Sequence, residues 1–179
     1  ILFSICYFSL ALPFSRAATA QFPDADRLAG FLGLFQSLNT GVALLASLFL
    51  ANRLFARFGI MPMLLLFPVI YLAGFGMLAI YAPFGLLVTA RFAQMAWMNG
   101  IAGTAWQALF NVVPPGQRDQ VRAFVGGVPE QAGTFLAGLI LMVGEQALSP
   151  RQLYLVGFLA AALLVYILWR ASRGYGQAL

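Results

Sequence analysis

Long apolar stretches follow one another along this chain, and nearly every charged residue lies in the short linkers between them. Because an α-helix rises about 1.5 Å per residue and the hydrocarbon core of a bilayer is about 30 Å thick, a stretch of about twenty apolar residues can cross a membrane. We therefore expect an all-α, polytopic membrane bundle that forms a single domain over residues 1–179. The pattern predicts six transmembrane helices, at about residues 1–19, 28–51, 60–81, 84–113, 121–143 and 152–169.

Prolines mark two of the expected helix boundaries. Pro13 is expected to kink or end the first helix, because proline lacks the N–H that an interior helical position donates. The sequence Ala82-Pro83-Phe84 predicts a tight turn between the third and fourth spans. The chain starts at Ile1 inside an apolar run without a positively charged leader, so we interpret it as a piece of a longer protein and not as a signal peptide.

The composition agrees with a membrane protein. Charged residues make up 8% of the chain, against about 25% in an ordinary soluble domain. All ten basic residues are arginines, and most of them lie at the ends of the predicted spans. Arginines in such positions orient helices and contact lipid phosphates, so we expect the lipid bilayer, and not nucleic acid, as a partner.

Two residue types that carry much membrane chemistry are scarce. The chain has no histidine and a single cysteine, Cys6. Two-histidine ligation of haem or zinc, a thiolate metal site and a disulfide framework are therefore excluded within these residues. Proteolysis by a Ser-His pair or a His-Glu-x-x-His helix is excluded on the same ground. We predict no metal, no cofactor and no enzymatic activity.

The arginines also predict an orientation. Linkers after the second, fourth and sixth spans are the more basic ones; they contain Arg53, Arg57, Arg118, Arg122, Arg170 and Arg173. The other linkers contain fewer arginines together with acids; they hold Arg16, Arg27, Arg151, Asp24, Asp26 and Glu145. The positive-inside rule then places both termini in the cytoplasm. The use of arginine alone among basic residues, in an alanine-rich and leucine-rich chain, indicates a bacterium, so we expect the membrane to be the bacterial inner membrane. The alternative is that this charge split arose by chance.

The second span carries small and polar side chains on an apolar background. Gly33, Ser37 and Gly41 follow one another at four-residue spacing, which lets a neighbouring helix approach closely. Gln36 and Asn39 lie among them and are costly when they face lipid. They are candidates either for interhelical hydrogen bonds or for contacts with a substrate.

The fourth span is the most polar. Thr104, Gln107 and Asn111 fall within a sector of about 60° of the helix, whereas Arg91 and Gln94 lie on roughly the opposite side. Arg91 has two interpretations: its side chain extends toward lipid headgroups, or it takes part in a solute pathway or an ion pair.

The fifth span aligns Gly126, Glu130, Thr134 and Gly138, each four residues from the next. Glu130 is the only carboxylate expected at membrane depth, where such a group must be paired, protonated or hydrated. It is a candidate for proton coupling. The alternative is a structural ion pair with an arginine of the adjacent basic loops, namely Arg118, Arg122 or Arg57.

Residues 52–59 read Asn-Arg-Leu-Phe-Ala-Arg-Phe-Gly. The matching loop of the major facilitator superfamily has Gly, then Leu, Asp, Arg and a second Gly, and this chain keeps Leu54, Arg57 and Gly59 while Ala56 replaces the Asp. With six spans and both ends inside, the chain resembles one six-helix half of such a transporter. The resemblance implies a gating loop that comprises Arg53, Arg57, Gly59, Arg118 and Arg122.

A closer resemblance is to the divergent branch that includes bacterial and plastid ATP/ADP translocases. Residues 109–118, then Arg122 and the glycines of the fifth span, carry it, and residues 170–179 are similar to an exit helix of some relatives. The resemblance implies alternating-access transport of a small solute, nucleotide-like or another organic anion, although the chain has no lysine for a nucleotide cavity.

This resemblance also implies a partner, since one half cannot enclose a cavity. A second six-helix half or a partner membrane subunit would complete it, with the small-residue stripes of the second and fifth spans at the interface. The fourth span would offer Gln107 and Asn111 to the solute. The alternative is a structural or accessory subunit that keeps the fold and does not transport.

Overall fold

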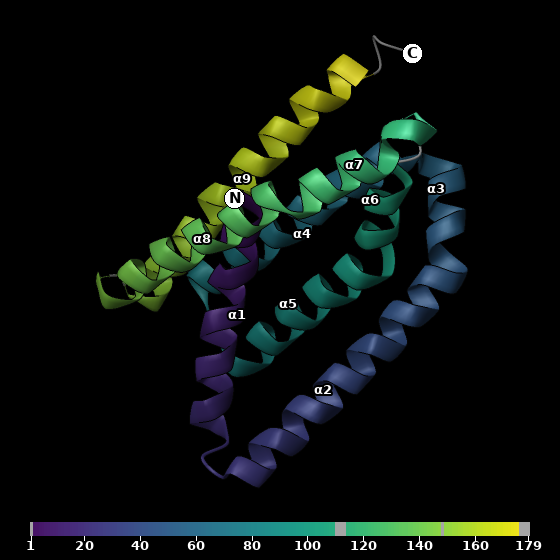
Figure 1. The fold of residues 1–179 in the computed structure, drawn as a ribbon. Coiled ribbons are helices and arrows are strands. Elements are labelled where there is room, and N and C mark those ends of the chain that lie inside the picture. The colour runs from purple at the N-terminus through teal and green to yellow at the C-terminus, as the bar shows by residue number, and fades with distance from the viewer. Residues whose placement is uncertain (1, 110–113, 148, 176–179) are drawn as a thin grey trace.

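A computed structural model describes residues 2–109, 114–147 and 149–175, and Figure 1 shows that the described chain is built from helices. The described residues contain no strand. Two short segments, η1 and η2, are π-helical and continue the α-helices on either side of them. The elements are α1 (Leu2–Gln21), α2 (Ala25–Leu45), η1 (Ala46–Ala51), α3 (Asn52–Phe58), α4 (Ile60–Ile80), α5 (Phe84–Trp97), η2 (Met98–Ala102), α6 (Gly103–Leu109), α7 (Pro115–Gly126), α8 (Val128–Ala147) and α9 (Pro150–Tyr175).

Among the described residues, 4 helical segments are long and apolar enough to cross a membrane. They are Leu2–Gln21, Ala25–Phe58, Pro62–Ile80 and Arg151–Arg170, which correspond to the first, second, third and sixth predicted spans. The predicted fourth span is helical as α5, η2 and α6 up to Leu109. The all-α fold and the membrane-spanning character of the chain are therefore supported, and the arrangement of six spans remains a prediction.

The predicted fifth span, residues 121–143, is not one helix. Helix α7 ends at Gly126, Gly127 leaves helical geometry with φ −90° and ψ −98°, and α8 starts at Val128. A helix that ran through Pro129 would leave the carbonyl of Val125 without its hydrogen bond, whereas proline is tolerated in the first turn of a new helix. The break also interrupts the four-residue register that was expected to align Gly126 with Thr134 and Gly138.

The other prolines behave differently. Helix α1 continues through Pro13 to Gln21, so of the two expectations for Pro13, a kink or an end of the helix, the end is contradicted. Helix α4 likewise contains Pro68. The predicted turn at Ala82-Pro83-Phe84 is confirmed, because α4 ends at Ile80 and α5 begins at Phe84.

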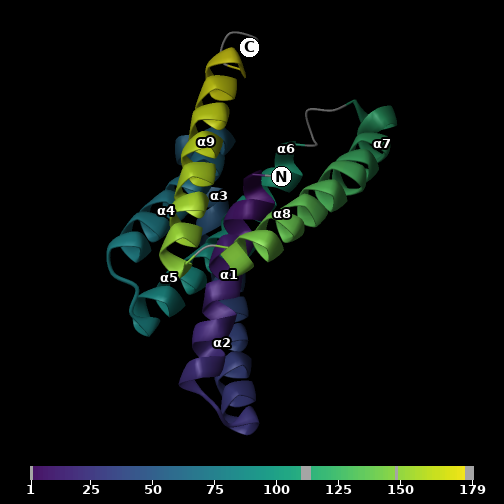
Figure 2. The ribbon, with the colours of Figure 1, turned by 90° about the vertical axis from the view of Figure 1, so that its left-hand side faces the viewer.

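Helix α1 is central to the packing. It contacts α5, α8 and α9, while α4 packs along α9 and α2 packs on α5 and η2. The core between these helices is largely aromatic and aliphatic, and its most buried members include Cys6, Leu10, Tyr71, Phe75 and Leu78. Figure 2 shows α8 leaving this packed region and leading to α7, which lies away from α4 and α9.

One end of the bundle gathers three helix boundaries. The last turn of α1, the start of α5 and the start of α9 surround the same hollow, which Gln21, Phe84 and Tyr154 help to line. The Nε of Arg151 donates to the carbonyl oxygen of Ala79 at 2.9 Å and so ties the start of α9 to the end of α4. Successive long helices therefore alternate in direction across the bundle.

Candidate functional site

Arg91 lies on the buried face of α5 and is 6% exposed. Its Nη1 donates to Oε1 of Gln94 at 2.8 Å, and its Nη2 donates to the hydroxyl of Tyr7 on α1 at 3.0 Å. The guanidinium carbon also lies 4.4 Å from the centroid of the Tyr7 ring, in cation–π contact. The side chain therefore points into the bundle, and the interpretation that it extends toward lipid headgroups does not hold in this structure.

The contacts of Arg91 continue to a third helix. Gln94, 1% exposed, follows Arg91 by one helical turn and donates from Nε2 to the hydroxyl of Tyr71 on α4. The ring of Phe67 packs edge-on against Tyr71 with 4.9 Å between centroids. We call Tyr7, Tyr71, Arg91 and Gln94 the Arg91 network; it joins α1, α4 and α5 in the interior of the bundle.

The charge of the Arg91 network is unusual for its surroundings. No carboxylate among the described side chains forms a salt bridge with Arg91, and Asp24 pairs instead with Arg27 at 3.7 Å on the surface. The guanidinium is held by a neutral amide, a neutral phenol and an aromatic face. A charged side chain at membrane depth is costly and is by default a candidate for function.

Asn39 forms a separate polar contact between α2 and α5. It is 0% exposed, and its Nδ2 donates to the carbonyl oxygen of Phe92 at 3.0 Å, while its Oδ1 has no hydrogen-bond partner. The structure thus gives Asn39 the interhelical hydrogen bond that was one of its two interpretations. Gln36, three residues earlier on α2, is exposed, so the structure does not bring these two candidates together.

The side chains of three candidates fall outside the described part of the structure. The side chains of Gln107 and Glu130 are not described, although their backbones belong to α6 and α8, and Asn111 lies in the undescribed segment 110–113. Their predicted roles remain predictions.

The predicted gating loop forms the end of α3 and the start of α7. Arg53 and Arg57 are exposed on α3, where the guanidinium carbon of Arg57 lies 5.4 Å from the centroid of the Phe58 ring. Gly59 ends α3 with φ 79°, a backbone conformation that residues with a side chain adopt only with strain. Arg118 and Arg122 lie one turn apart on α7, in the region that Figure 2 shows away from α4 and α9.

The predicted packing stripes face away from the described helices. Gly33, Ser37 and Gly41 on α2 are exposed, and no atom lies within 4 Å of a Cβ built on either glycine. On α8, Thr134 and Gly138 are exposed as well, and Gly126, beyond the break on α7, is also exposed. That a second polypeptide covers these stripes is still a prediction.

Two other glycines, Gly100 and Gly157, lie in close contact with a neighbouring helix. A Cβ at Gly100 in η2 would lie 2.9 Å from the carbonyl oxygen of Ala43 and 3.0 Å from the Cβ of Ala46. A Cβ at Gly157 in α9 would lie 2.6 Å from Cζ of Phe75. These glycines let η2 approach α2, and α9 approach α4.

The two tyrosines of the Arg91 network were not among the candidates predicted from the sequence. A signal was present, because a tyrosine inside an apolar span needs a hydrogen-bond partner for its hydroxyl once it is buried.

Comparisons of the chain with protein-family models, with curated proteins and with solved structures give no match. The geometry of the Arg91 network is therefore the main guide to function.

Proposed function

We propose that this chain is one membrane-embedded half of an alternating-access transporter, of the kind found in the major facilitator superfamily, that carries a small organic anion. The observation that carries the proposal is Arg91, a buried cation that no described carboxylate neutralises. In this proposal Arg91 attracts the solute, which is nucleotide-like or another organic anion, and the chain performs no enzymatic step. The cost of burying this charge supports a functional role, since an arginine in a membrane helix costs up to about 2.5–3.5 kcal/mol, the value at the helix centre.

The guanidinium is suited to an anion. It has five N–H donors in a planar fork, and the bonds to Gln94 and Tyr7 leave donors for a carboxylate or a phosphate. Tyr7 covers one face of the guanidinium at 4.4 Å. Access of a solute to Arg91 therefore requires α1 to move relative to α5, and rocking of a helix bundle about a central site supplies such a motion.

Three further residues have the roles in this proposal that were predicted for them from the sequence. Glu130 is the proposed coupling carboxylate, and Gln107 and Asn111 are proposed solute contacts. A second six-helix half or a partner subunit completes the cavity, with Gly33 and Gly41 at its interface. The distribution of arginines supports an orientation with both termini in the cytoplasm, and in this proposal the membrane is a bacterial inner membrane.

A second candidate function is a structural or accessory membrane subunit. The observation that favours it is the burial of the same polar side chains, since Arg91, Gln94 and Asn39 are at most 6% exposed. In this role the Arg91 network only ties α1, α4 and α5 together. The two functions differ in the role of the charge of Arg91: transport requires this charge to bind the solute, whereas the accessory role requires it only for the stability of the fold.

Uptake by proteoliposomes that contain the full-length protein tests the proposal. Labelled ATP, ADP and succinate serve as probes, and Arg91→Gln is compared with Arg27→Gln, which removes the same charge from an exposed surface pair. We expect Arg91→Gln to lower uptake about tenfold or more, because a charge-assisted hydrogen bond is worth about 1.5–3 kcal/mol, and Arg27→Gln to leave it unchanged.

Thermal unfolding in detergent separates loss of transport from loss of fold. Arg91→Lys keeps the charge and is the second variant if Arg91→Gln does not fold. A folded Arg91→Gln protein with normal uptake contradicts the assigned role of Arg91. Absence of uptake of all three probes by the folded wild-type protein supports the accessory role.

A further inference from the structure

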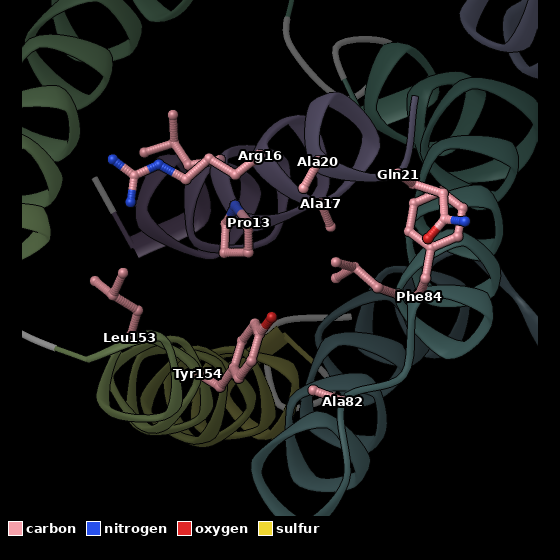
Figure 3. A pocket seen from close by; sticks show the side chains of 11 residues that line it. Pro13, Arg16, Ala17, Ala20, Gln21, Ala82, Phe84, Leu153 and Tyr154 are labelled. Carbon is pink, nitrogen blue, oxygen red and sulfur yellow. The ribbon is translucent and has the colours of Figure 1, made fainter. Parts of the chain in front are cut away.

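A hollow of about 450 Å³ opens between α1, α5 and α9, at the end of the bundle where helix boundaries gather. Figure 3 shows it from close by. Its volume lies within the range of about 300–1,000 Å³ that is typical of ligand pockets. Apolar side chains from all three helices line most of it, among them Leu12, Pro13, Phe84, Leu87 and Leu153. We call it the α1–α5–α9 pocket.

Tyr154 places an unpartnered polar group in this pocket. The residue is 5% exposed, and its hydroxyl makes no hydrogen bond with the described residues, whereas the hydroxyls of Tyr7 and Tyr71 are both bonded. Figure 3 shows the Tyr154 hydroxyl directed into the hollow, toward Pro13 and Ala17 of α1. The hydroxyl is open to the hollow and not enclosed by the described side chains, so it is available to donate a hydrogen bond to a polar group of a ligand.

The pocket also has a basic end. Arg16 lines it from α1, and Gln21 lines it from the last residue of the same helix. Arg151, one turn before Tyr154 on α9, is fixed at the end of α4 by its bond to Ala79. Guanidinium groups near the ends of membrane helices reach the depth of lipid headgroups, where their donors can bind a phosphate.

We propose that the α1–α5–α9 pocket binds an anionic phospholipid. The phosphate is bound by Arg16 and the hydroxyl of Tyr154, and an acyl chain lies along Leu12, Leu87 and Leu153. The apolar lining favours a lipid over a soluble anion, since it contributes nothing to the binding of free phosphate. This site is separate from the Arg91 network and does not depend on transport.

Lipid-dependent thermal unfolding of the purified full-length protein tests the site. Phosphatidylglycerol, phosphatidylcholine and inorganic phosphate are added separately in detergent. We expect phosphatidylglycerol to raise the unfolding temperature more than phosphatidylcholine does, and phosphate alone to have no effect. An equal effect of the two lipids contradicts the role of the charge, and stabilisation by phosphate alone contradicts the role of the acyl chain.

Three variants test whether the stabilisation by phosphatidylglycerol arises from binding in this pocket. Tyr154→Phe and Arg16→Gln are each expected to weaken the apparent affinity for phosphatidylglycerol about tenfold, through loss of a hydrogen bond to a charged group. Ala20→Trp fills the pocket and is expected to abolish the lipid effect. Tyr81→Phe and Arg27→Gln are matched controls, because both wild-type side chains are exposed and do not line the pocket.

The outcomes are independent of the proposed transport. An unchanged lipid effect in folded Tyr154→Phe and Ala20→Trp proteins overturns the site, whatever the result of the uptake assay. Arg91→Gln is expected to keep the full lipid effect if it folds. A lipid effect without uptake leaves the site standing and contradicts only the transport proposal.

Discussion

Two sets of glycines in the helices of this chain have opposite surroundings. Gly100 and Gly157 lie against neighbouring helices so closely that a methyl group would be within 3 Å of an atom of the neighbour. Gly33 and Gly41 are regularly spaced in the sequence, yet nothing lies within 4 Å of their Cβ positions. Regular spacing therefore identifies a small-residue face, but it does not show whether this chain covers that face.

The difference follows from which face of α2 packs against the other helices. Helix α2 turns Phe35, Asn39 and Ala43 toward α5 and η2, and these residues are buried. Its remaining surface exposes Leu34, Leu45 and several further apolar side chains together with the glycine stripe. Such a surface is compatible with lipid over the leucines and with a second polypeptide over the stripe.

The largest effect on stability is expected for Gly100→Ala. The new methyl group would meet the backbone carbonyl of Ala43 at 2.9 Å, and a backbone atom cannot rotate out of the way. Helices α2 and η2 must separate, so we expect a loss of about 1–3 kcal/mol in the free energy of unfolding, the usual cost of overpacking. Thermal or denaturant unfolding in detergent measures it.

Gly41→Ala is the matched control for Gly100→Ala. Its methyl group meets no atom within 4 Å, and alanine has the higher helix propensity, so we expect unchanged or slightly raised stability. Equal destabilisation by the two substitutions would show that α2 and η2 are not in the contact described here.

A smaller loss is expected for Gly157→Ala. Three ring atoms of Phe75 lie at 2.6–2.9 Å from the built Cβ, and the end of a side chain gives way more readily than the backbone carbonyl that faces Gly100. We expect a loss of about 1 kcal/mol, at the low end of overpacking costs. The double variant Gly157→Ala/Phe75→Leu should be less destabilised than the sum of its two single variants, because the shorter side chain makes room for the methyl group.

A comparable or slightly smaller loss is expected for Tyr71→Phe. The substitution removes the hydroxyl that accepts from Gln94, so a buried amide donor loses its partner, which costs about 1 kcal/mol. Tyr166→Phe is the control, since Tyr166 is exposed on α9. A neutral Tyr71→Phe variant would show that Gln94 finds another acceptor and that the Arg91 network does not depend on α4.

Much of the fold could be predicted from hydrophobic runs and breakers. The C-terminal end of α4 and the start of α5 follow from Ala82-Pro83-Phe84, and four of the long apolar runs correspond to segments able to span a membrane. The break between α7 and α8 was missed, although Gly126-Gly127-Val128-Pro129 contains the local signal for it. The apolar residues on both sides of the break were interpreted as one helix. Greater weight was given to this apolar run than to the glycines and the proline, which disfavour a continuous helix.

Less of the candidate site could be predicted. Arg91 and Gln94 share one face of α5 at a spacing of three residues, and this was visible in the sequence. Their partners Tyr7 and Tyr71 are 84 and 23 residues away along the chain. Those contacts depend on how α1 and α4 pack against α5, which no local pattern determines.

The smallest effect on the stability of this chain, and the sharpest test of the open face of α2, is expected for the double variant Gly33→Leu/Gly41→Leu. Both side chains would enter open space, so we expect the free energy of unfolding to change by no more than about 0.5 kcal/mol. If the proposed second half packs on this stripe, the leucines should prevent close approach and lower the yield of chemical crosslinks between the halves. Leu38→Phe adds bulk to an exposed position on another side of α2 and should not alter crosslinking. Normal crosslinking in the double variant would place the second half on a different surface, whereas destabilisation comparable to that of Gly100→Ala would show that this face is already covered by the chain itself.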